Sequence, residues 1–296
     1  MATTIKAAFK VFSSNLELTD RQEALVSSPR ENLEKALIRG LSLHSKEATR
    51  VTGSWDRRTL TRYLSEADVD VMVILKYGVH KDWDTSEGTI KALDRFKALL
   101  DDAYPDTSKR RAQNCITMQF SEFKLDVVPT FKHVDGYYKI PDSVRKLWVP
   151  TNPFTFAEKI TEVNKTMDER FVPLIKMVKG WNREVGWPVR SFHLECLMYN
   201  RYRSYKEGYT YCSMLKYFFE KLPDYLARVC YDPVMRDRVG SYLDNEAKKT
   251  NRQIAIEKAK AAAATAKGAY ELQRKDEKKA IKAWQGLMGE FFPAYG

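Results

Sequence analysis

The sequence has few cysteines and no long uncharged apolar run. Nowhere do about 18 apolar residues follow one another, and the N-terminal segment lacks the basic region, apolar core and cleavage site of a secretory signal. Both absences predict a cytoplasmic protein that has no membrane partner. The cysteines lack C-x-x-C spacing, which excludes the common zinc and redox motifs, so we expect four buried thiols: Cys115, Cys196, Cys212 and Cys230.

Internal repeats and flexible linkers are also missing. Of the 296 residues, 44% are hydrophobic and 30% are charged, which is typical of a folded protein and not of a disordered or fibrous one. The length allows one large domain or two closely packed ones. The formal net charge of +11 favours an anionic partner, which could be nucleic acid, a membrane surface or nucleoside triphosphates.

Two kinds of pattern divide the chain near residue 150. Residues 4–49 show helical periodicity, and strand-like apolar runs follow at 68–75, 115–120 and 123–131, whereas helical patterns alone follow after 150. We therefore expect an α+β fold: a mixed sheet with a long N-terminal helix in residues 1–150, packed against an all-helical domain in residues 151–296, with a cleft between them. The alanine-rich stretch 257–284 predicts a packed C-terminal helix.

Acidic residues interrupt the apolar run that follows the pair Gly53-Ser54, in the order Asp68-Val69-Asp70-Val71. Because strand side chains alternate between faces, Asp68 and Asp70 project to one side and the valines to the other. Two like charges so close need a cation, most simply a divalent metal ion, and carboxylate oxygens select Mg²⁺ or Mn²⁺ over zinc. The pair predicts a metal site for phosphate chemistry.

A third carboxylate, Asp126, lies in the apolar stretch KLDVVPTF and completes a site for two ions. We predict that Asp68, Asp70 and Asp126 are both metal ligands and catalytic residues. One ion would lower the pKa of an attacking sugar hydroxyl, and the other would stabilise the leaving pyrophosphate. Asp126 would bind the ion that activates the hydroxyl. Gly53 permits close backbone approach to phosphate, and the Ser54 hydroxyl can hydrogen-bond phosphate oxygens.

Ordinary structural roles stay open for several of these residues. The three carboxylates could lie on strand edges at the surface, and the Gly-Ser pair could form a simple turn. Arg57 and Arg58 either contact phosphates or are flexible surface arginines. We expect His193 to be a hydrogen-bonded core histidine, because a metal-activated hydroxyl needs no base, and we expect Trp181 to lie in the core.

The Gly-Ser turn, thirteen intervening residues and a strand with two acids together resemble the signature of the polymerase-β-like nucleotidyltransferase superfamily. Within it, the chain is similar to the bacterial relatives of cyclic GMP-AMP synthase and oligoadenylate synthase, the CD-NTases (DncV-like enzymes). The segments IKMVKGWN, SFHLECLMYN, CYDPV and WQGLMGEFFP carry the rest of the likeness. The resemblance implies a nucleotidyltransferase sheet capped by a helical domain.

The resemblance also implies roles for residues in the second half of the chain. Lys179 and Ser191 would touch the donor triphosphate, and Phe192 would stack on a base. Lys176 and Lys179, three residues apart on a helix, could instead be solvated. The implied reaction joins ATP and GTP into a cyclic oligonucleotide signal for anti-phage (CBASS) defence, with cyclic GMP-AMP as the expected product and a downstream effector that senses it.

Two alternative functions have to be weighed against this reaction, together with nucleic acid and an E1/E2-like enzyme as possible partners. A relative that extends RNA or makes linear oligoadenylate is the alternative, whereas a nucleic-acid-binding module with a decayed site is disfavoured because all three acids are present. The zinc insertion of the vertebrate sensor has no match here, so we expect a monomer that is active without added nucleic acid. Some bacterial relatives are joined to targets by E1/E2-like enzymes, which makes Gly296 a candidate attachment point; otherwise it is a frayed end.

Overall fold

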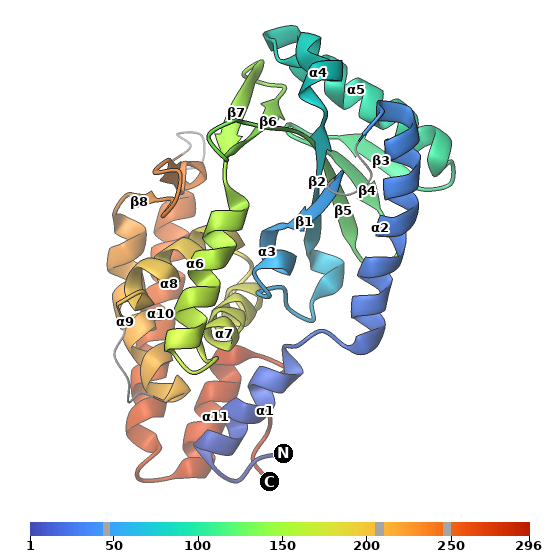
Figure 1. Cartoon of the computed structure of the whole chain (residues 1–296). Coiled ribbons are helices and arrows are strands. Elements are labelled where there is room, and N and C mark those ends of the chain that lie inside the picture. The colour runs from blue at the N-terminus through green and yellow to red at the C-terminus, as the bar shows by residue number, and fades with distance from the viewer. Residues whose placement is uncertain (44–47, 205–209, 245–249) are drawn as a thin grey trace. The chain divides into compact units, whose positions relative to one another are not determined.

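The structure is a computed structural model, and it describes residues 1–43, 48–204, 210–244 and 250–296 (Figure 1). Its internal contacts divide it into two compact units. We call Leu18–Ala157 the sheet unit, and we call Met1–Glu17 together with Glu158–Gly296 the helical unit.

The sheet unit is built on a seven-stranded mixed sheet. Its strand order is β1-β2-β5-β4-β3, and β6 pairs with β5 and β7. Strands β2 and β5 run parallel, and the other pairs are antiparallel. In chain order the elements are α2 (Asp20–Leu41), β1 (Thr49–Thr52), α3 (Gly53–Asp56), β2 (Asp68–Leu75), α4 (Tyr77–His80), α5 (Ser86–Ala103), β3 (Ser108–Arg111), β4 (Ile116–Gln119), β5 (Lys124–Lys132), β6 (Tyr138–Asp142) and β7 (Leu147–Thr151).

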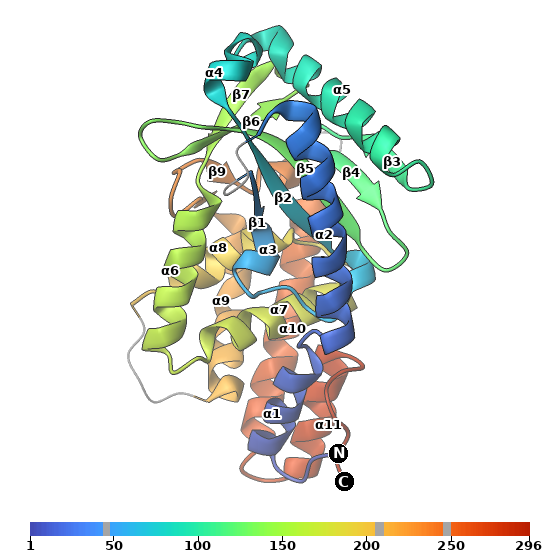
Figure 2. The same ribbon diagram turned by 45° about the vertical axis from the view of Figure 1, so that its right-hand side comes forward.

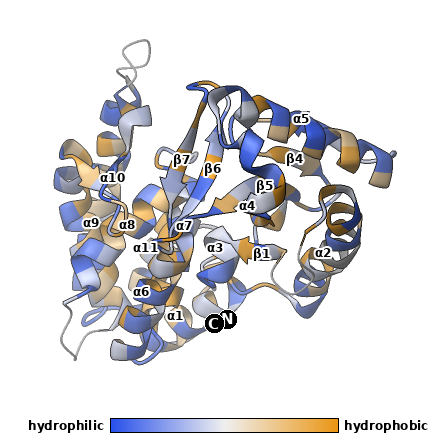
Figure 3. Ribbon diagram, turned by 45° about the horizontal axis from the view of Figure 1, so that its top comes forward, coloured by the Kyte–Doolittle hydropathy of each residue, from blue (hydrophilic) through white to orange (hydrophobic). Residues whose placement is uncertain are grey.

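One face of this sheet packs on α2 and α5 and forms the main core of the unit. The strand side chains alternate, so that Val69, Val71 and Val73 are buried on this face. They share one cluster with Leu37 of α2 and Phe96 of α5, both fully buried. Figure 3 shows hydrophilic and hydrophobic residues mixed along α2 and α5, as expected of helices with one buried face. The predicted alternation of valines and aspartates is confirmed.

The helical unit contains seven helices among its described residues, together with a short hairpin. They are α1 (Ile5–Asn15), α6 (Pro153–Thr166, which begins in the sheet unit), α7 (Phe171–Glu184), α8 (Ser191–Tyr202), α9 (Tyr211–Ala227), the hairpin β8 (Cys230–Tyr231) and β9 (Arg238–Val239), α10 (Thr250–Leu272) and α11 (Glu277–Met288). The mixed sheet with helical regions confirms the predicted fold class. The prediction that residues 151–296 are all helical was wrong, because the β8–β9 hairpin lies among them.

Helix α10 packs along α9 and α11 through small side chains (Figure 2). Its buried residues form an alanine seam: Ala255, Ala259, Ala262, Ala266 and Ala269. Small side chains let neighbouring helices approach closely, so the alanine-rich stretch serves packing and its lysines face solvent. The stretch is not the single predicted helix, however, because residues 273–276 separate α10 from α11. The four cysteines are free and buried, as predicted. No helix among the described residues is both long and apolar enough to cross a membrane.

By its contacts the first helix belongs to the helical unit, whereas the sequence placed it in the domain of residues 1–150; the predicted domain division stays a prediction. Helix α1 places the Phe9 ring 5.2 Å from Trp284 and 5.1 Å from Phe292, and it places Phe12 5.2 Å from Phe292, measured between ring centroids. Aromatic burial of this kind outweighs proximity in sequence. At the other end of the chain, the Gly296 N–H donates to the Ala2 carbonyl, and conjugation through Gly296 stays a prediction.

We predict that Phe12→Ala destabilises the protein by about 3–5 kcal/mol, because the ring is fully buried and its loss leaves a cavity. Chemical denaturation followed by circular dichroism measures the change. Lys10→Ala on the same helix removes an exposed side chain and is the control, with an expected change within about 0.5 kcal/mol. Equal effects of the two substitutions would show that α1 does not depend on its aromatic contacts.

Candidate active site

The Gly-Ser pair lies where β1 ends and the short α3 begins. Gly53 has φ +70°, a left-handed conformation that side chains disfavour. A Cβ atom at this position would lie 2.1 Å from Asp70 Oδ2, so only glycine lets the turn approach this carboxylate. The Ser54 carbonyl accepts hydrogen bonds from Thr59 N–H (2.8 Å) and Leu60 N–H (3.0 Å), which fixes the loop. The glycine therefore has two steric reasons to be conserved in any working variant.

Strand pairing brings the predicted acids together. Asp70 is directly opposite Asp126 in the parallel pair of β2 and β5, and Asp68 is opposite Lys124. Neighbouring strands lie about 4.8 Å apart, and opposite residues project to the same face, so the Asp70 and Asp126 side chains share one small region. The structure thus brings together the Gly53 turn and all three predicted aspartates.

The shared region is electrostatically unfavourable for carboxylates alone. Burial raises the pKa of Asp70 to about 7, with a further upward contribution from Asp126 that the charge of Arg57 opposes. Burial and the charge of Asp126 also raise the pKa of Asp68, although Lys124 Nζ lies 3.7 Å from Asp68 Oδ1. Asp126 Oδ1 is buried without a hydrogen-bond partner in the described part of the chain. These carboxylates need a positive charge that the protein itself supplies only in part.

The donor set fits a divalent metal ion. It consists of hard carboxylate oxygens, one of them buried and unpartnered, beside a glycine whose missing side chain leaves room. As placed, no group of three or more histidine, cysteine, aspartate or glutamate side chains among the described residues is arranged to hold a metal ion. Asp68 is 53% exposed, which leaves this side chain free to turn toward an ion. The residues that would hold ions are therefore Asp68, Asp70 and Asp126.

Several neighbours of the acids were not predicted or were left open. Arg57 is buried, and its guanidinium carbon lies 5.5 Å from the centre of the Phe156 ring, so it is a fixed part of the site and not a flexible surface arginine. Arg58 is exposed. Thr117 of β4 is opposite Asp126, which places its hydroxyl on the acid face. Cys115 is buried nearby, where burial and the charge of Asp126 raise the pKa of its thiol.

The same face of the sheet continues into an apolar cluster. Met72, Val128 and Phe154 pack together there with Tyr138. The Arg50 guanidinium carbon lies 3.5 Å from the centre of the Phe154 ring, and Arg50 Nη1 donates to the Tyr138 hydroxyl at 3.1 Å. The acids are therefore bordered by aromatic surface on one side. Separate strands and helix α6 contribute these residues, so no local sequence signal could have grouped them.

The remaining predicted site residues belong to the helical unit. Lys179 is buried and pairs with the fully buried Glu195, and Lys176 Nζ lies 2.5 Å from Glu17 Oε2. The possibility that these lysines are solvated was therefore wrong. Ser191 is the first residue of α8. Phe192 is 37% exposed, and the nucleotide roles of Lys179, Ser191 and Phe192 stay predictions.

His193 and Trp181 lie where the sequence predicted. Both are buried in the helical unit. His193 Nδ1 lies 3.1 Å from the Tyr242 hydroxyl, and burial, with a smaller effect of Arg252, lowers the pKa of His193 to about 4. A neutral, hydrogen-bonded imidazole of this kind is a core residue.

Comparison with known proteins places this site in a family. The profile of the Second Messenger Oligonucleotide or Dinucleotide Synthetase domain matches residues 3–164, which is more than half of the chain. The chain therefore belongs to this family and is a bacterial CD-NTase, a nucleotidyltransferase, as the resemblance implied. Enzymes of this family generally use divalent metal ions.

Relatives of known sequence resemble most of the chain. It is 28% identical to the cyclic AMP-AMP-AMP synthase of Acinetobacter sp., over 83% of this chain and 72% of that protein. It is 24% identical to a probable cyclic nucleotide synthase of Bacillus cereus, over 100% of this chain and 99% of that protein.

Solved structures share the fold. Escherichia coli CdnC with ATP superposes with a TM-score of 0.73 at 17% identity, over 98% of this chain and 99% of that one. The Vibrio cholerae cyclic AMP-GMP synthase DncV, in complex with the linear intermediate 5′ pppA(3′,5′)pG, gives a TM-score of 0.75 at 14% identity, over 95% and 93%.

We predict that Asp70→Asn stabilises the metal-free protein above pH 7, by on the order of 1–3 kcal/mol. The folded-state pKa of Asp70 is about 7 and its ordinary value is 3.8, so the folded protein holds a proton that the unfolded chain loses first. Wild-type stability therefore falls as pH rises from about 4 to 7, relative to the variant. Urea unfolding in EDTA from pH 4 to 8 measures the difference.

The control for this experiment is Asp102→Asn, which changes an exposed carboxylate on α5. It should leave the pH profile of stability as it is in the wild type. If Asp70→Asn is no more stable than the wild type at pH 8, the carboxylates do not repel one another in the folded protein.

Proposed function

We propose that this protein is a metal-dependent cyclic oligonucleotide synthase that makes a second messenger from ATP, alone or with GTP, in CBASS anti-phage defence. The observation that carries the proposal is the pairing of Asp70 with Asp126 against the Gly53 turn. Carboxylates with raised pKa values beside a phosphate-accommodating turn suit nucleotidyl transfer. The family membership supports the same reaction class.

The roles of the residues follow from their positions. Asp68, Asp70 and Asp126 would hold two divalent ions, Mg²⁺ or Mn²⁺, which when bound lower the pKa of the attacking hydroxyl and stabilise the leaving pyrophosphate. Gly53 leaves room for a phosphate close to the backbone. Ser54 presents a hydroxyl that makes no hydrogen bond within the described chain and can donate to a phosphate oxygen.

The use of ATP is supported by three relatives. One is named a cyclic AMP-AMP-AMP synthase, CdnC was solved with ATP, and DncV was solved with an intermediate that begins with adenosine. The cyclic GMP-AMP expected from sequence stays a prediction, and the Acinetobacter relative favours a cyclic triadenylate as the second candidate product. Linear oligoadenylate synthesis or RNA extension is the competing activity of the same superfamily.

We predict that the purified protein converts ATP, with or without GTP, into a cyclic oligonucleotide when Mg²⁺ or Mn²⁺ is supplied, and that it does so without nucleic acid. Mass spectrometry of phosphatase-treated products from all four nucleoside triphosphates identifies ring size and bases. A phosphatase-resistant cyclic product supports the proposal. Linear products alone would favour the competing activity, and a requirement for duplex DNA or RNA would overturn the constitutive behaviour.

We predict that Asp126→Ala lowers turnover by at least a thousandfold but leaves ATP binding within a few-fold of the wild type. The reason is that Asp126 is assigned to the ion at the attacking hydroxyl, whereas donor triphosphate binding uses the other acids and the Gly-Ser turn. Turnover and ATP affinity in Mg²⁺ are measured on the same preparation. Asp106→Ala, an exposed change, is the control and should alter neither. Product at a few percent of the wild-type rate would remove Asp126 from the metal site.

A further inference from the structure

A concave site lies in the helical unit, beside the β8–β9 hairpin. It is bounded by the last turn of α8, the end of α9 and strand β8, and its volume is about 470 Å³. Ligand sites of small molecules usually measure about 300–1,000 Å³. Four arginines and two tyrosines dominate its wall: Arg201, Arg203, Arg228, Arg236, Tyr225 and Tyr231.

The charge in this arginine pocket is of one sign. Among the described residues, no carboxylate lines it and none of the four arginines forms an ion pair. Asp232 on the hairpin is engaged elsewhere, because its Oδ1 accepts from the N–H groups of Val234 (2.7 Å) and Met235 (3.1 Å). Several guanidinium groups around one concavity repel each other unless an anion lies between them. The pocket is therefore built for an anion.

Helix dipoles explain only part of the cluster. Arg203 and Arg228 are the C-cap residues directly after α8 and α9, where a cation is favourable without any ligand. Arg236 follows no helix and has φ +64°, a left-handed conformation that is uncommon for arginine. The hairpin turn holds it there, since Arg236 N–H donates to the Asp232 carbonyl at 3.1 Å. Binding of an anionic ligand accounts for the positions of Arg203, Arg228 and Arg236, whereas the helix dipoles account only for Arg203 and Arg228.

Aromatic side chains narrow the ligand class. Tyr231 is 54% exposed and Tyr225 is half-buried, and both line the pocket. Arginine forks bind phosphate oxygens in pairs, and tyrosine rings stack on nucleobases. We propose that the arginine pocket of the helical unit binds a nucleoside oligophosphate through its own arginines and without metal ions, with either a free nucleoside triphosphate or an oligonucleotide product as its source.

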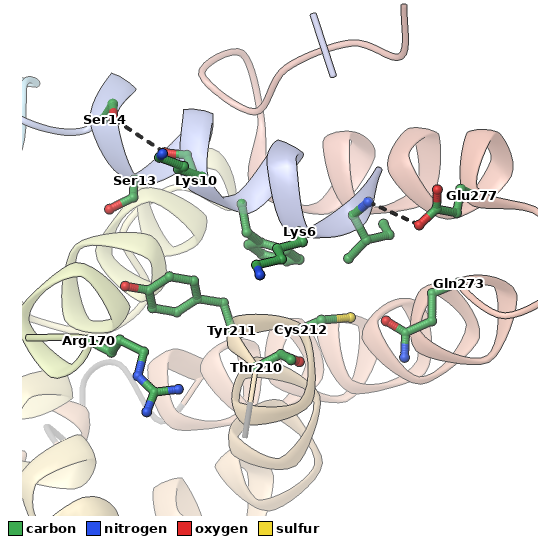
Figure 4. Close-up of a pocket in the computed structure, with 12 residues that line it drawn as sticks. Lys6, Lys10, Ser13, Ser14, Arg170, Thr210, Tyr211, Cys212, Gln273 and Glu277 are labelled. Carbon is green, nitrogen blue, oxygen red and sulfur yellow. Dashed lines mark hydrogen bonds between the residues drawn. The ribbon is translucent and has the colours of Figure 1, made fainter. Parts of the chain in front are cut away.

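A larger cavity of the same unit shows the contrast. It measures about 790 Å³ between α1, α9 and the turn before α11 (Figure 4). Its cations are Lys6, Lys10 and Arg170, but Glu277 also lies in the wall, where its Oε1 accepts from Ile5 N–H at 3.4 Å. A carboxylate in the wall works against phosphate binding. The arginine pocket has no carboxylate among the described residues that line it, so it is the better oligophosphate site.

Binding in EDTA separates the two sites, because the aspartate site needs metal ions to attract phosphates and the arginines do not. Fluorescence anisotropy of an ATP analogue, with EDTA present, is measured for wild type, Arg228→Gln/Arg236→Gln and Asp68→Asn/Asp70→Asn. The matched control is Arg39→Gln/Arg274→Gln, which removes the same charge from two exposed positions outside the pocket. Unlabelled ATP, tripolyphosphate, cyclic AMP-AMP-AMP and cyclic GMP-AMP serve as competitors.

We expect the pocket variant to bind at least tenfold more weakly than wild type, and the control and the aspartate variant to stay within about twofold. Stronger competition by ATP and tripolyphosphate identifies a triphosphate occupant, and stronger competition by the cyclic compounds identifies a product. The proposal is overturned if no analogue binds in EDTA, if the control loses as much affinity as the pocket variant, or if the aspartate variant loses binding. Since no turnover is measured, these outcomes do not depend on the proposed reaction.

Discussion

The parallel pairing of β2 with β5 is the constraint on which the site depends. It sets Asp70 directly opposite Asp126, on the face of the sheet away from α2 and α5. A slip of either strand by one residue would turn its carboxylate into the apolar core and its buried valines to the opposite face, so the valines fix the register. The hydrophobic core and the acidic site therefore depend on the same strand register, and neither can be altered alone.

This arrangement places function in conflict with stability. Two carboxylates on adjacent strands, one with its pKa raised to about 7, are unfavourable without a cation. Arg57 offsets part of the charge from a fixed, buried position against Phe156. Gly53 loses more conformational entropy on folding than another residue would, but its missing side chain lets the backbone approach Asp70. Each of these features is costly in an inert domain and useful in an enzyme that binds metal ions and phosphates.

Local sequence patterns were enough to predict the alternating strand, the Gly-Ser turn and the three acids, because each depends on residues close together in the chain. The contacts between residues on different strands could not be predicted from local sequence. Thr117 meets Asp126 only through the register of β4 on β5, and Arg50 meets Tyr138 only through the fold of the whole unit. Lys179 shows the same limit, since its lysine spacing suits a solvated helix face and its burial depends on Glu195.

The assignment of the three aspartates to divalent ions is tested most directly by titrating the protein with Mn²⁺ and measuring free Mn²⁺ by electron paramagnetic resonance at pH 8. The structure predicts that the wild type binds Mn²⁺ and that Asp70→Asn/Asp126→Asn loses at least tenfold in affinity, because the ions then have one carboxylate instead of three. Equal Mn²⁺ binding by the wild type and this variant would contradict the account.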